Sequence, residues 1–170
     1  MEQQVNKKKT RHFVKARERV SGSDPAYAKS LTEQIFEAFS SGELPPEEWS
    51  HEAHMQVGLW YLLNHTTDEA MQRLRQGIID YNHACGIANT ESSGYHETVT
   101  RFYCAIIAHF LKSQDRSRPV DELAQRLVDQ YGEKRLPLKY YSKELLRSPK
   151  ARLEWVEPDL RPIPDVFLGG

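Results

Sequence analysis

The chain has 170 residues, of which 39% are hydrophobic and 28% charged, and its formal net charge is −1. This composition is typical of one soluble domain with its own core, and the near-zero charge gives no general attraction to nucleic acid or to anionic membranes. No apolar run approaches the roughly 20 residues of a membrane-spanning helix, so we expect no membrane partner. Because no signal-peptide core is seen and the two cysteines form no C-x-x-C pair, we expect reduced thiols and a cytoplasmic location.

Residues 1–22 are rich in lysine and arginine and poor in apolar residues, which favours a basic flexible arm. A role for this arm in binding anions or nucleic acid stays open, but the arm lacks the spaced aromatic residues on which bases stack, so a nucleic-acid partner is not favoured. We expect residues 23–150 to form the folded domain and residues 151–170 to form an extension that packs on it.

Apolar residues recur at helical spacing in five segments, bounded by capping residues, glycines and prolines. These segments predict helices over about residues 25–41, 49–64, 67–85, 95–112 and 119–131. Shorter helical turns are expected after Ser142 and Ser148, and the prolines from Pro158 on predict an extended tail. No stretch alternates as a β-strand does. The sequence therefore predicts an all-α fold, a single bundle of about five helices with an extended C-terminal tail.

The segment from Trp49 to Leu63 is apolar on nearly every side, as expected for a helix enclosed by others. It carries His51 and His54, which are three positions apart and therefore lie one turn apart on one face. Gly58 follows one turn later on that face, where we expect it to leave free volume. Two imidazoles beside a gap on an interior face indicate a site.

A third histidine, His96, follows the polar loop 86–94 and opens another apolar helix. Neutral imidazole is the commonest metal ligand, and catalytic zinc typically has three protein ligands and one open position. We therefore predict one divalent transition metal, zinc or iron, held by three side chains: His51, His54 and His96. The alternative is that these histidines form a hydrogen-bonded structural network.

Glu97 follows His96 directly, so its side chain leaves the helix about 100° away. It is expected to act as a general acid or base, or as a further metal ligand. A set of two histidines and one carboxylate would instead favour ferrous iron and oxygen chemistry. Because they flank this motif, three residues are expected to contact substrate: Tyr95, Asn89 and Thr98.

Four motifs together resemble a family of small uncharacterised bacterial helical proteins: His51-x-x-His54, Tyr95–Thr98, Tyr140–Ser142 and Trp155–Leu160. The resemblance covers roughly residues 49–160 and implies a shared fold, with the three predicted ligands and Glu97 at motif positions. More remotely, the layout is similar to the DinB-like helix bundles, which hold a metal with three histidines from two helices. Those proteins pair their later histidines, whereas this chain pairs the earlier ones.

These observations predict a small metal-dependent enzyme that acts on a small-molecule substrate. Zinc would indicate a hydrolase or lyase, and iron an oxygenase. The alternative is a non-enzymatic binding or interaction module whose histidines are structural. No phosphate-binding glycine motif and no nucleophile elbow is found, so kinase and dinucleotide-dependent functions have little support. The sequence leaves the oligomeric state open.

Overall fold

The computed structural model describes residues 28–164. Within that range the chain forms seven α-helices, two short 3-10 helices (Pro46–Glu48 and Leu136–Lys139) and no strand. The α-helices are α2 (Leu31–Ser40), α3 (His51–Asn64), α4 (Thr67–Ala84), α5 (Glu97–Lys112), α6 (Val120–Tyr131), α7 (Lys143–Leu146) and α8 (Pro149–Leu153). The predicted all-α bundle is confirmed, since α2 to α6 are the five long helices. No helix in this range is both long and apolar enough to cross a bilayer.

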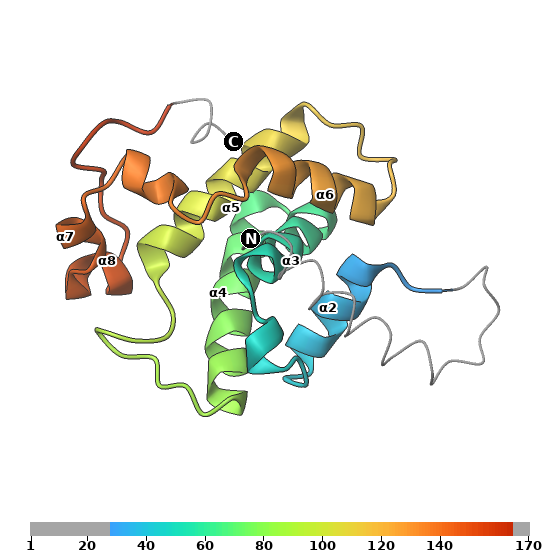
Figure 1. Ribbon diagram of the computed structural model, residues 1–170, viewed down its shortest axis with the longest axis horizontal. Coiled ribbons are helices and arrows are strands. Elements are labelled where there is room, and N and C mark those ends of the chain that lie inside the picture. The colour runs from blue at the N-terminus through green and yellow to red at the C-terminus, as the bar shows by residue number, and fades with distance from the viewer. Residues whose placement is uncertain (1–27, 165–170) are drawn as a thin grey trace, which may run out of the picture.

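Helix α3 lies at the centre of the bundle and contacts α2, α4, α5 and α6 (Figure 1). Its side chains are buried in several directions, which explains why the segment is apolar on nearly every side. The free volume expected at Gly58 is absent, because a Cβ built there would lie 2.8 Å from Cδ1 of Ile107. Gly58 instead allows α5 to approach α3 closely.

Polar side chains fix where the helices begin. Ser30 and Glu33 form a capping box for α2, so this helix begins at Leu31 and leaves Ala28 outside it. The start that we predicted near residue 25, like the basic arm, lies outside the described residues. Helix α3 begins two residues later than Trp49, because the side chain of Ser50 accepts a hydrogen bond from the Ala53 N–H.

The segment after α6 packs against α5 on the side of the bundle away from α2 (Figure 1). Ala151, Val156 and Ile163 are buried there together with Phe102 and Ile106 of α5. Residues 154–164 are not helical, as the prolines predicted. This contact positions the α5 end that carries His96 and Glu97.

Candidate functional site

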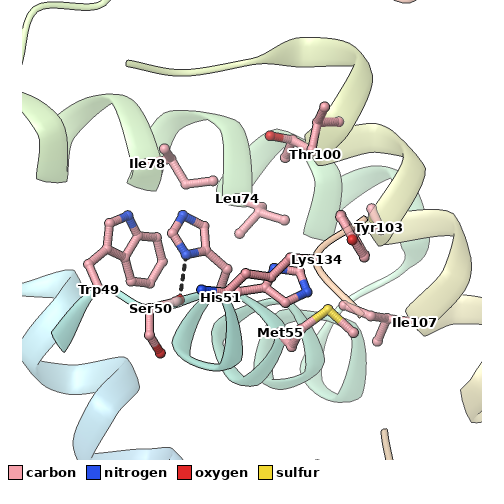
Figure 2. A pocket seen from close by; sticks show the side chains of 13 residues that line it. Trp49, Ser50, His51, Met55, Leu74, Ile78, Thr100, Tyr103, Ile107 and Lys134 are labelled. Atoms are coloured by element: carbon pink, nitrogen blue, oxygen red, sulfur yellow. Dashed lines mark hydrogen bonds between the residues drawn. The ribbon is translucent and has the colours of Figure 1, made fainter. Parts of the chain in front are cut away.

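The first turn of α3 forms one wall of a pocket of about 420 Å³ that lies between α3, α4 and α5 (Figure 2). Helices α4 and α5 supply mostly apolar side chains, and exposed Lys134, from the segment after α6, completes the lining. The described lining residues are Trp49, Ser50, His51, His54, Met55, Leu74, Ile78, Val99, Thr100, Tyr103, Cys104, Ile107 and Lys134. Two of the three predicted metal ligands therefore share this site.

His54 is a neutral hydrogen-bond acceptor in the pocket wall. Its ring stacks on Trp49, with the ring centroids 3.6 Å apart. Nδ1 lies 2.7 Å from the carbonyl oxygen of Ser50, and because a carbonyl only accepts, the proton is on Nδ1 and the lone pair on Nε2. Burial lowers the pKa of His54 to about 4; the Ser50 carbonyl opposes this shift, and nearby His51 adds to it.

His51 holds a buried ring nitrogen without a partner in this wall. Among the described residues nothing hydrogen-bonds to its Nε2, although that atom is buried. The ring lies edge-on to Tyr103, with the centroids 4.9 Å apart. Burial lowers the pKa of His51, and the positive charge of Lys134 lowers it further, so this ring is also neutral.

The third predicted ligand, His96, does not join the other two. Its Nε2 donates to the carbonyl oxygen of Leu146 at 2.8 Å, and its Nδ1 accepts the Val99 N–H at 3.3 Å as the N-cap of α5. Both nitrogens are therefore occupied by the fold. Over residues 28–164, no group of three or more His, Cys, Asp or Glu side chains could hold a metal ion. The three-histidine centre is not formed in this structure.

Glu97 belongs to a structural ion pair and not to the pocket. Its carboxylate accepts two hydrogen bonds from Arg75, one from Nε at 2.8 Å and one from Nη2. It accepts a third from the Tyr95 hydroxyl at 2.7 Å. Burial alone would raise the pKa of Glu97, but the bonds from Arg75 and Tyr95 outweigh it, and the pKa lies below its ordinary value. An ionised, fully bonded carboxylate is poorly placed to act as acid or base.

The other predicted substrate contacts hold the backbone in place. The side chain of Asn89 accepts the Tyr95 N–H at 2.9 Å and the Asn82 amide at 2.7 Å, which closes the 86–94 loop. Thr98 is fully buried; its hydroxyl donates to the carbonyl of Glu154 at 2.8 Å and accepts the Val156 N–H at 3.2 Å. The motif Tyr95–Thr98 is thus a junction between α4, α5 and the C-terminal segment.

The residues that complete the pocket carry weak signals in the sequence. Val99, Tyr103 and Ile107 are four residues apart and so share one face of α5, which a helical reading assigns to the core. Cys104 lies beside them, and burial raises the pKa of its thiol to about 11, so it behaves as a small core residue and not as a nucleophile. Lys134 lies in an irregular segment, where no periodicity indicates its direction.

Comparison of the chain with protein-family models, with curated proteins and with solved structures gave no match. The resemblances drawn from the histidine motifs therefore stay predictions.

Proposed function

We propose that this protein binds a small, mostly apolar molecule in the pocket between α3, α4 and α5. The volume of about 420 Å³ is in the range of ligand-binding pockets, which are lined chiefly by apolar and aromatic groups with a few polar atoms. Here Met55, Leu74, Ile78 and Ile107 would contact the body of the ligand. The histidines would fix its orientation.

The observation that carries the proposal is the buried Nε2 of His51, which has no partner among the described residues. A buried polar atom without a hydrogen bond costs about 1–3 kcal/mol, and such atoms are rare in native proteins. A ligand with a hydrogen-bonding group would satisfy this atom. His54 supports the same conclusion, because its fixed tautomer presents Nε2 as an acceptor for a hydroxyl or N–H group.

The pocket residues do not fit the metal-dependent mechanism that the sequence suggested. His51 and His54 would supply two imidazoles, but His96 is occupied by Leu146 and Val99, and Glu97 by Arg75. Of the two functions predicted from the sequence, a binding module has the stronger support.

A fragment screen monitored by ¹H–¹⁵N NMR tests the proposal. Millimolar apolar fragments carrying one hydroxyl, amide or acid group should shift the amide signals of residues 49–55 and 99–107. Thr100→Trp, which fills the pocket, should abolish these shifts. His51→Phe should weaken binding about three- to tenfold, as expected for one lost hydrogen bond, whereas His83→Phe on the exposed face of α4 should not.

Two results would contradict the proposal. One is a screen in which no fragment shifts the signals of these residues. The other is that the fragments bind Thr100→Trp as tightly as they bind the wild type, because such fragments would lie elsewhere on the surface. Circular dichroism of Thr100→Trp, and the unchanged NMR signals of its α2 residues, would show that the variant is folded.

A further inference from the structure

Lys134 places a positive charge at the opening of the pocket, and a hydrogen bond from Tyr103 anchors the segment that carries it. Lys134 is exposed and lines the pocket close to His51 (Figure 2). The residue before it, Glu133, is tied to α5, because the hydroxyl of Tyr103 donates to its carbonyl oxygen at 3.0 Å. Tyr103 therefore contacts the ring of His51 and also anchors the segment that presents Lys134.

This charge is not neutralised within the described part of the chain. The adjacent carboxylate of Glu133 is already paired with Nζ of Lys139 at 2.6 Å. Over residues 28–164, no carboxylate lies within ion-pair distance of Lys134. None of the described lining residues is acidic. The pocket thus combines an apolar interior with one unpaired cation at its opening.

We propose that the ligand is an apolar carboxylic acid whose carboxylate lies between Lys134 and His51, with its hydrocarbon body in the pocket. This inference rests on the proposed function. One carboxylate oxygen would accept from the ammonium group of Lys134. The other would accept from Nε2–H of His51 once that ring turns toward the pocket, because Nε2 is buried in this structure. Both bonds suit a carboxylate, which has two acceptor oxygens and gains from a charge-assisted donor. The apolar residues Leu74, Ile78 and Ile107 would take the body of the acid.

The titratable and charged groups around His51 are few. Those that line the pocket with it are His54 from α3, Tyr103 and Cys104 from α5, and Lys134 from the segment after α6. Burial keeps His54 neutral. It also raises the pKa of both Tyr103 and Cys104, so these two stay uncharged at neutral pH. Lys134 is then the single charge among the described lining residues, and none of these residues carries a negative charge that would repel an anion.

Matched pairs of ligands test the sign of the charge. The probes are short-chain and aryl-substituted carboxylic acids and their primary amides, which have nearly the same shape without the charge. Titration calorimetry on the full chain should show each acid binding roughly tenfold more tightly than its amide. Lys134→Gln should remove this preference. Lys143→Gln, at an exposed lysine of α7 that does not line the pocket, should retain it.

The outcomes separate this inference from the proposed function. Amides that bind as tightly as acids would overturn the anion preference and leave the binding pocket intact. A preference that survives Lys134→Gln would also overturn it, because another group would then hold the carboxylate. If neither acids nor amides bind, and no fragment shifts the pocket signals, both proposals fail. Loss of the preference in Lys134→Gln alone, with amide binding unchanged, supports the inference.

Discussion

Glu97 and Arg75 form a bidentate ion pair that joins the start of α5 to the middle of α4. The two partners differ in burial, since the side chain of Glu97 is 8% exposed and that of Arg75 is 43% exposed. The Tyr95 hydroxyl donates to the same carboxylate. Removing one partner therefore has a different consequence from removing the other.

Arg75→Met should destabilise the fold more than Glu97→Gln. The first change leaves a buried carboxylate with only the Tyr95 hydroxyl, at a cost of about 2–3 kcal/mol. The second leaves a half-exposed guanidinium that water can solvate, at a cost of about 1 kcal/mol. Urea unfolding at neutral pH measures both. Arg118→Met is the control, because its pair with Glu122 is exposed and should contribute little. Equal costs for Arg75→Met and Arg118→Met would contradict this reading.

The burial of neutral His54 predicts how stability depends on pH. Its pKa falls from an ordinary value of 6.5 to about 4 in the fold, with burial as the main cause. Because the folded pKa is the lower one, the unfolded chain binds the proton first. The stabilising contribution is complete above about pH 6.5 and is lost progressively as pH falls toward 4.

Between about pH 7 and about pH 5 this linkage amounts to roughly 2 kcal/mol of unfolding free energy. His54→Phe keeps a ring against Trp49 but removes the titrating group. Over the same pH interval, the unfolding free energy of this variant should fall by roughly 2 kcal/mol less than that of the wild type. Exposed His83 offers the control, since His83→Phe should leave the slope of the wild type unchanged. Chemical denaturation at several pH values gives the slopes. Parallel slopes for the wild type and His54→Phe would show that His54 titrates normally.

The helices could be predicted from the sequence because each is encoded locally. Apolar spacing and caps such as Thr66 with Glu69, or Ser142 before α7, act within a few residues of the helix that they begin. The difference at the start of α3 is also local, because Ser50 is an N-cap that the sequence displays and the helix begins after it and not at Trp49. The start predicted for α2 near residue 25 lies outside the described residues, within which Ser30 caps this helix.

The site was only half predictable, because its remaining contacts join distant segments. His51 and His54 were placed on one face by helical geometry, and the structure lines one pocket with both. His96 has the same chemistry, but its direction is set by a carbonyl 50 residues later, at Leu146. Lys134 could not be found at all, because nothing in an irregular segment indicates that Tyr103 will bond the carbonyl of the preceding residue, Glu133.

Two glycines that flank the 86–94 loop should respond differently to alanine. Gly86 and Gly94 both have positive φ angles, of 70° and 73°, so a side chain costs about 1 kcal/mol at either position. At Gly86 nothing lies within 4 Å of the added Cβ, whereas at Gly94 it would meet Oδ1 of Asn89 at 2.6 Å and the carbonyl oxygen of Ala88 at 2.7 Å.

Gly94→Ala should therefore cost at least about 2 kcal/mol, twice the cost of Gly86→Ala, because it also displaces the Asn89 side chain that closes the loop. Urea unfolding compares the two variants. Amide exchange at Tyr95 gives a local readout, since its N–H donates to Asn89. If both variants lose the same stability and Tyr95 stays protected, the close contact at Gly94 does not constrain the loop.

His51 and His96 are both partly buried histidines, and replacing each by phenylalanine should change stability in opposite directions. His51→Phe removes a buried nitrogen without a partner and places a ring against Tyr103, so it should raise the unfolding free energy by about 1 kcal/mol. His96→Phe removes the bond to Leu146 and the N-cap of α5, so it should lower that energy by about 2 kcal/mol.

Thermal unfolding of both variants, without added ligand, makes the comparison. If His51→Phe is more stable than the wild type but binds fragments more weakly, His51 is a binding residue, because residues that bind a ligand often destabilise the fold. A loss at both positions would mean that His51 is structural as well. The proposed pocket would then lack the polar atom on which its assignment rests.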